Sequence, residues 1–183
     1  DPRIADAQGN TPLHLAARGA DPVIAALLVD AGAQVDAVNA DGFTPLAIAC
    51  GNANWRIAEF LLEHGAQAQA HATQPAIVHA AAIADDDPAG VKLLLRRRAA
   101  VDARAPLERT ALMTAALAGH ARTVESLLAG GASVDLADHR GTTALMEAAR
   151  SGVVAAIDAL GKRKPQPDLL DGSGRTALMI ACQ

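Results

Sequence analysis

GNTPLHLAARG, the stretch from Gly9 to Gly19, returns along the chain in altered form. Its later copies read GFTPLAIACG, RTALMTAALAG, TTALMEAARSG and RTALMIAC. The threonines that anchor the copies are separated by 33, 66, 33 and 33 residues: Thr11, Thr44, Thr110, Thr143 and Thr176. A catalytic motif usually occurs once, so a stretch that returns at a fixed period indicates a repeat architecture.

The 66-residue gap contains a degenerate copy, PAIVHAAAIA, in which Ala76 stands where threonine is expected and His79 is matched to His14. Downstream of each anchor, a leucine pair precedes a sequence related to Gly-Ala-x-Val-Asp. The pairs are Leu27-Leu28 with GAQVD, Leu61-Leu62 with GAQAQ, Leu93-Leu94 with RAAVD, and Leu127-Leu128 with GASVD. Several independent positions therefore recur in one register.

This pattern resembles the ankyrin repeat, which has a 33-residue period and a T-P-L-H-x-A signature. The resemblance covers essentially the whole chain. It implies an all-α repeat solenoid of stacked helix-turn-helix ankyrin repeats with short β-hairpin or turn fingers. Repeats are expected at 6–38, 39–71, 72–104 (degenerate), 105–137 and 138–170, with a partial sixth at 171–183. Residues 1–5 resemble the end of a preceding repeat, so we expect a piece of a longer protein.

The signature residues have physical roles. Proline fits the first turn of a helix, so Pro12 and Pro45 are predicted to start helices that Thr11 and Thr44 cap. The glycine after the leucine pair is predicted to end the second helix with positive φ. The leucine two residues after each repeat threonine is expected to point inward. These leucines are Leu13, Leu46, Leu112, Leu145 and Leu178.

The resemblance also implies that the motif histidines, His14 and His79, form hydrogen bonds within and between repeats. DAQG, NADG, DHRG and DGSG would form the fingers, because Asp, Asn and Gly favour turns. We expect local irregularity where the sequence departs from the repeat pattern. The departures are the finger at His71 to Gln74, the extra residue around ADDDPAG, Arg98 and Glu108 in place of glycine, and the stretch LGKRKPQPD.

Composition narrows the partners. Hydrophobic residues make up 51% of the chain and aromatic residues 2%, so the core must be built from Ala, Leu, Val and Ile. A net charge of −4 gives no electrostatic footprint for nucleic acid. No apolar run is long enough to span a membrane, and no leader peptide is recognised. The two cysteines fit either a reducing or an oxidising compartment, and the cytoplasm is the expected location.

The six histidines do not predict a metal site, because stacked repeats advance about 10 Å each and metal ligands lie about 2 Å from the ion. The same spacing separates Cys50 from Cys182 too far for a disulfide. Both thiols are interpreted as small buried side chains that replace alanine.

Two charge clusters have structural interpretations. Asp87-Pro88, at the end of the run Asp85 to Asp87, is predicted to cap a helix whose first residue is the proline. Arg96-Arg97-Arg98 is predicted to end a helix on a solvated face. No phosphate loop or nucleophile elbow occurs, so neither an enzyme activity nor a cofactor is predicted.

Slightly rotated repeats create an extended concave surface that binds partners. By resemblance, finger tips and exposed positions of the first helices form it. Phe43, an aromatic on a finger, is equally well explained by packing against the adjacent finger. The predicted partner-binding residues are Phe43, Asn52, Ile83, Leu107, Arg109, Leu117, His139, Arg140, Arg150 and Arg175.

Apolar residues flanked by arginines are enriched at interface hot spots. We therefore predict a protein–protein interaction module that binds an acidic and apolar segment toward its C-terminal half. The partner is another protein or another domain of the same parent chain, not nucleic acid, a membrane or a small-molecule substrate. The alternatives are a substrate-recruiting or regulatory segment of a larger enzyme or secreted bacterial effector, and a purely structural spacer.

Overall fold

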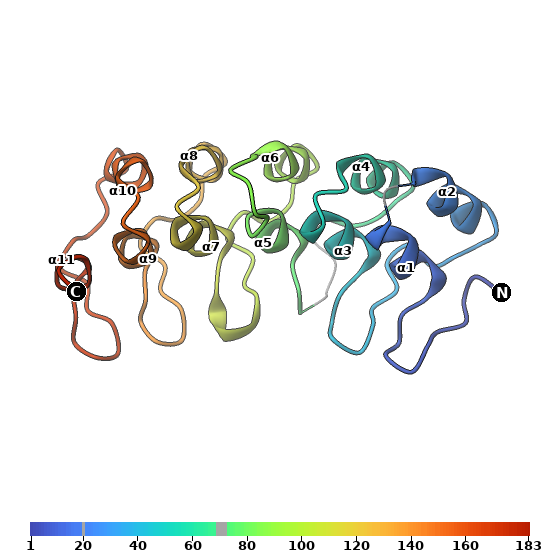
Figure 1. The fold of residues 1–183 in the computed structure, drawn as a ribbon, viewed down its shortest axis with the longest axis horizontal. Coiled ribbons are helices and arrows are strands. Elements are labelled where there is room, and N and C mark those ends of the chain that lie inside the picture. The colour runs from blue at the N-terminus through green and yellow to red at the C-terminus, as the bar shows by residue number, and fades with distance from the viewer. Residues whose placement is uncertain (20, 69–72) are drawn as a thin grey trace.

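The computed structural model describes residues 1–19, 21–68 and 73–183 and consists of helices joined by turns. The helices form two rows (Figure 1). The inner row contains α1 (Pro12–Arg18), α3 (Pro45–Gly51), α5 (Ala76–Ala80), α7 (Ala111–Ala118), α9 (Ala144–Ser151) and α11 (Ala177–Ala181). The outer row contains α2 (Pro22–Asp30), α4 (Trp55–Glu63), α6 (Ala89–Arg96), α8 (Ala121–Ala129) and α10 (Val154–Gly161).

The outer helices α2, α6, α8 and α10 are each followed by a long turn that projects beyond the inner row before the next inner helix begins (Figure 1). The two termini lie at opposite ends of the stack. A short 3₁₀ helix, Pro106–Glu108, lies in one of these turns. An isolated antiparallel bridge joins Ala137 to Thr143 in the next. The predicted all-α solenoid with turn-like fingers is confirmed.

Threonine hydroxyls cap the N-termini of most of the inner helices. Thr44 Oγ1 accepts a hydrogen bond from the Ala47 N–H at 3.1 Å, as predicted. The equivalent bonds of Thr110, Thr143 and Thr176 measure 3.3, 3.4 and 3.3 Å. In repeat three the helix starts differently, because Pro75 is the N-cap of α5. The match of Ala76 to threonine and of His79 to His14 was therefore wrong by one residue.

His14 joins two repeats, as the resemblance implied. Its Nδ1 accepts from the Thr11 N–H at 3.1 Å, so the ring proton lies on Nε2, which donates to the Phe43 carbonyl at 3.1 Å. Burial lowers the pKa of His14 below its usual value, which keeps the ring neutral. His79 instead bonds Gln74 of its own repeat at 3.1 Å, and its ring centroid lies 4.9 Å from that of Phe43.

The core consists of small and branched aliphatic side chains packed between the two rows. Leu13, Leu46 and Leu112 are at most 1% exposed, as predicted. The prediction for Leu178 was wrong: it is 74% exposed, because α11 packs against α9 and its other side is uncovered. Leu145 is half-buried.

The two thiols differ. Cys50 is fully buried, and burial raises its pKa to about 12, so it acts as an inert apolar side chain. Cys182 follows α11 and is exposed, contrary to the prediction of a buried thiol.

The fingers are closed by acidic or amide side chains. Asp138 Oδ1 accepts from the N–H groups of Arg140 and Thr142 at 2.8 and 2.9 Å. Asp6, Asn39 and Asp171 make the same pair of bonds in their own fingers. Successive fingers are then joined through their backbones: Ala40 to Gln8 at 3.0 Å, His139 to Leu107 at 3.1 Å, and Gly172 to Arg140 at 2.6 Å.

Two residues that replace a repeat glycine adopt the positive φ angle that the glycine has in the other repeats. Gly32, Gly65 and Gly131 have φ of 87°, 95° and 91° after their outer helices, and Arg98 has φ of 60° at the equivalent position. Glu108 likewise has φ of 61° in the finger before α7. The backbone at Arg98 thus keeps the conformation of the glycines it replaces, and irregularity was not found there. The finger with Glu108 is irregular, as predicted, because it contains a 3₁₀ turn with Leu107 at positive φ. Part of the finger at His71 to Gln74 lies outside the described residues.

The acidic run before α6 stabilises two helices. Asp87 Oδ1 accepts from the Ala89 N–H at 3.0 Å, but α6 begins at Ala89 and its N-cap is Pro88, so the prediction that Asp87 is the N-cap was wrong by one residue. Asp86 reaches the next repeat and accepts from the N–H groups of Arg122 and Thr123 at 2.8 and 2.9 Å, at the start of α8. The sequence did not predict this second role.

Helices α4 and α6 approach closely where Gly90 of α6 faces Trp55 of α4, and a substitution at Gly90 tests this contact. A Cβ at Gly90 would overlap the Trp55 ring, whose Nε1 is held by Asp87 Oδ2 at 3.1 Å. We expect Gly90→Ala to lower the free energy of unfolding by about 1–3 kcal/mol in urea denaturation. Gly161→Ala is the control, because no atom lies within 4 Å of its added Cβ. A Gly90→Ala variant as stable as the control would contradict the packing.

His14 predicts a pH dependence. Its pKa is lowered in the folded state, so the unfolded chain binds more protons below about pH 6.5, and the free energy of unfolding falls as pH decreases. His14→Gln should be less stable at pH 7 yet lose less stability between pH 7 and 5 than wild type. Equal slopes in urea titrations across this range would show that His14 does not contribute.

Candidate functional site

A groove of about 520 Å³ lies between three successive fingers and the inner helices behind them. We call it the finger groove. Its fingers are residues 105–109, 138–142 and 171–175, which precede α7, α9 and α11. The lining residues are Leu107, Arg109, Leu117, Asp138, His139, Arg140, Thr142, Glu147, Arg150, Asp171, Gly172, Ser173 and Arg175.

Seven of the ten residues predicted to bind a partner line this groove: Leu107, Arg109, Leu117, His139, Arg140, Arg150 and Arg175. Phe43 and Asn52 line a separate hollow of about 220 Å³, which His79 also borders. The structure therefore brings seven of the predicted residues together in one groove and places Phe43 and Asn52 in another.

Ile83 was predicted to be exposed, and this was wrong. The side chain is 8% exposed and lines neither hollow. The cause is the start of α5 after Pro75, which puts Ala82 rather than Ile83 at the position of Leu117, and Ala82 is exposed.

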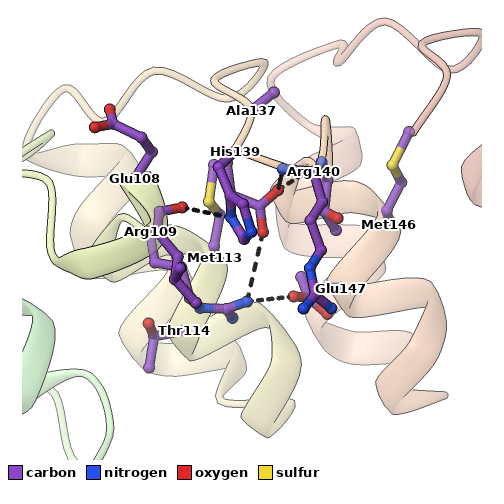
Figure 2. Close-up of polar contacts among 12 residues, drawn as sticks. Glu108, Arg109, Met113, Thr114, Ala137, His139, Arg140, Met146 and Glu147 are labelled. Atoms are coloured by element: carbon purple, nitrogen blue, oxygen red, sulfur yellow. Dashed lines mark hydrogen bonds and ion pairs between the residues drawn. The ribbon is translucent and has the colours of Figure 1, made fainter. Parts of the chain in front are cut away.

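Arg109 and Glu147 form the central ion pair of the groove (Figure 2). Arg109 Nη1 lies 2.7 Å from Glu147 Oε1 and 3.8 Å from Asp138 Oδ2. The side chains of both acids are 5% exposed, against 25% for Arg109. Arg109 extends from one finger, Asp138 lies in the next, and Glu147 lies on α9, so the pair joins repeats four and five.

The second carboxylate oxygen of Glu147, Oε2, has a longer contact than the first. Oε2 lies 3.4 Å from Arg150 Nε in an ion pair, yet this buried atom accepts no hydrogen bond. Buried carboxylate oxygens are normally hydrogen-bonded. Glu147 therefore has one buried oxygen that is paired with Arg150 but accepts no hydrogen bond.

Arg175 is paired within its own finger. Its Nη2 and Nε lie 2.8 and 3.0 Å from Asp171 Oδ2. The backbone N–H of Arg175, and then its guanidinium, hold the pKa of Asp171 below its usual value. Three of the four predicted arginines, Arg109, Arg150 and Arg175, thus have acidic partners inside the chain.

Arg140 differs from these three. It is exposed, and within the described chain no acidic side chain forms an ion pair with its guanidinium. Its backbone is fixed by the N–H bond to Asp138 and by the carbonyl bond from Gly172. The side chain extends from its finger into the space beside the Arg109–Glu147 pair (Figure 2).

The apolar side of the groove comes from Leu107 and Leu117, which are 57% and 41% exposed. Leu107 lies in the 3₁₀ turn with φ of 65°, a conformation that costs a non-glycine residue about 1–2 kcal/mol. Arg104 supports this turn through bonds to the carbonyls of Glu108 and Ala137 at 3.3 and 3.2 Å. His139 also holds it, because its backbone N–H and its Nδ1 both bond the Leu107 carbonyl at 3.1 Å.

Sequence reasoning missed the acids of the groove: Asp138, Glu147 and Asp171. Asp138 and Asp171 were assigned to turns only. Glu147 carried one signal, a charge in the otherwise apolar stretch Ala144 to Ala149. A charge at such a position is rarely buried unless it is paired, and Arg109 was the available partner one repeat away.

Among residues 1–19, 21–68 and 73–183, no group of three or more His, Cys, Asp or Glu side chains is placed to hold a metal ion. None of the helices in the described ranges is long and apolar enough to cross a bilayer.

The two rows of helices and the row of fingers define a helical repeat solenoid. The family model for ankyrin repeats (three copies) matches residues 1–72 and 78–171. The chain belongs to the ankyrin repeat family, whose repeats are protein–protein interaction modules.

The crystal structure of the human ASB11 ankyrin repeat domain is similar, with a TM-score of 0.88 and 28% sequence identity. The match covers 99% of this chain and 81% of that one. A comparison with curated proteins gave no match.

The Arg109–Glu147 pair predicts a stability effect. Glu147→Ala removes the 2.7 Å partner of a mostly buried guanidinium, so we expect a loss of about 3 kcal/mol in the free energy of unfolding. Glu125→Ala is the matched control, because Glu125 pairs with Lys162 at 2.9 Å on an exposed surface and should cost less than about 1 kcal/mol. Equal losses in the two variants would contradict the buried role.

Proposed function

We propose that this chain is a non-catalytic protein-binding module that holds a segment of a partner protein in the finger groove. The observation that carries the proposal is the groove itself, where exposed leucines and arginines from repeats four to six gather on fixed fingers. The partner is another protein or another domain of the same parent chain.

The fixed geometry of the fingers supports this function. The backbone bonds from His139 to Leu107 and from Gly172 to Arg140 hold three fingers in one row. A surface that is ordered before binding loses less conformational entropy when a partner is bound. By resemblance to the family, the groove lies on the concave face.

The chemistry of the groove favours binding over catalysis. Its charged groups are mostly arginines paired with carboxylates, and Cys50, whose thiol pKa is raised by burial, lies outside it. With a net charge of −4, the chain has no excess of cations for nucleic acid. We accordingly propose no nucleic acid, membrane or small-molecule substrate as its partner.

Leucine variants test the proposal without breaking ion pairs. Immobilised wild type and the double variant Leu107→Asp, Leu117→Glu are each incubated with lysate of the cells that express the protein. We expect the double variant to lose specific bands, because acidic side chains replace the apolar wall; circular dichroism checks that it is folded. Asp at position 107 tolerates positive φ.

Val154→Asp is the control, since Val154 is a 66% exposed apolar residue at the start of α10 in the outer row, where an acid is tolerated. Bands lost with this control but kept by the groove variant would place the interaction on the outer row. The absence of specific bands with wild type would contradict binding to a separate protein and would leave only a domain of the same parent chain as the partner.

A further inference from the structure

We infer that the finger groove selects a partner segment by one carboxylate side chain, read by Arg140, next to one apolar side chain, held by Leu107 and Leu117. This inference rests on the proposed function and specifies the chemistry of the ligand. It differs from the sequence prediction, in which four arginines together attract an acidic segment.

The arginines of the groove are not equivalent. Four arginines and three acids line it, so a single positive charge remains when histidine is neutral. Arg109, Arg150 and Arg175 already contact Glu147 or Asp171 at 2.7, 3.4 and 2.8 Å. Arg140, whose guanidinium lacks an acidic partner in the described chain, is the cation available to a ligand.

Three acids near Arg140 restrict the charge of that ligand. Asp138 closes the finger that carries Arg140, Asp171 closes the next finger, and Glu147 also lines the groove. A phosphate of charge near −2 would be repelled by these carboxylates, while one carboxylate balances the single excess charge. A run of several acidic residues is disfavoured for the same reason.

Glu147 is not a contact for the ligand, because its Oε2 is buried and pairs with Arg150 Nε at 3.4 Å. The side chains offered to a ligand come from two repeats: Leu107 and Leu117 from repeat four, and Arg140 from repeat five. A peptide segment can reach both the apolar and the charged contact, whereas a free small carboxylate reaches only Arg140.

Leu107 supplies the apolar contact at a cost in backbone strain. The finger before α7 has Ala105 where the fingers of repeats one, two, five and six have Asp or Asn, and Glu108 where they have glycine. The resulting 3₁₀ turn exposes Leu107 at positive φ beside Leu117. Strained residues that remain exposed concentrate at binding sites.

Together the contacts specify an internal Asp or Glu adjacent to a residue such as Leu, Met or Phe. A phage-displayed library of random 12-residue peptides tests this directly, because the displayed peptides have no free C-terminal carboxylate. Selections are run on wild type, Arg140→Glu and the control Arg122→Glu, which reverses an exposed arginine on α8 in the outer row.

We expect wild type and Arg122→Glu to enrich peptides with one acidic residue beside an apolar one, and Arg140→Glu to lose this preference. A synthetic enriched peptide with an amidated C-terminus should bind Arg140→Glu about tenfold more weakly or worse than wild type. Replacing its acidic residue with the matching amide should give a similar loss on wild type and little further loss on Arg140→Glu.

Four results would overturn the inference. Enriched peptides without an acidic residue, or peptides that bind Arg140→Glu as tightly as wild type, would refute the carboxylate and leave the proposed function standing. A stronger preference for a phosphorylated form of the peptide would replace the carboxylate by a phosphate. A library without enrichment would show that a short segment is not the ligand, and the lysate experiment then decides the proposed function separately.

Discussion

Each helix pair in this chain has an apolar face that the next repeat must cover, and the structure depends on that contact. Leu13, Leu46 and Leu112 are almost fully buried between neighbouring repeats, whereas Leu178, on the last inner helix, is exposed. Polar contacts across the same boundaries fix the register. His14 bonds Phe43, and Asp36 and Asp102 bond the backbone of Gln67 and Ser133 in the following repeats. Each bond spans about one repeat, so the period of the sequence is also the period of the contacts.

In repeats four to six the same kind of contact builds the candidate site. The Arg109–Glu147 pair joins two repeats, and Asp171 closes a finger while it pairs with Arg175. These residues hold the fingers in place, and Arg140 and Leu107 project from the resulting frame. A charge reversal at Arg109 would therefore disturb both the fold and the surface. Leucine and Arg140 variants separate the two effects, since these side chains are exposed and have few partners within the chain.

The fold could be predicted from the sequence because its signal is repeated: threonine caps, leucine pairs and turn residues recur together. Predictions were wrong where the repetition was weakest. In repeat three, without threonine, the helix began one residue earlier, and this shift buried Ile83 and changed the role of His79. The location of the candidate groove could be predicted from the finger positions, because seven of the ten residues chosen in this way line it. The pairing inside it could not, because an arginine looks equally available whether or not Glu147 lies 2.7 Å away.

The central claim is that partners bind to the finger groove, and hydrogen exchange measured by mass spectrometry tests it most directly. The protein would be compared alone and with the partner recovered from the lysate experiment. The account predicts slower exchange of amides in residues 105–109, 138–142 and 171–175 on binding, with the outer helices α6, α8 and α10 unchanged. Protection confined to those outer helices, with the three fingers unchanged, would contradict it.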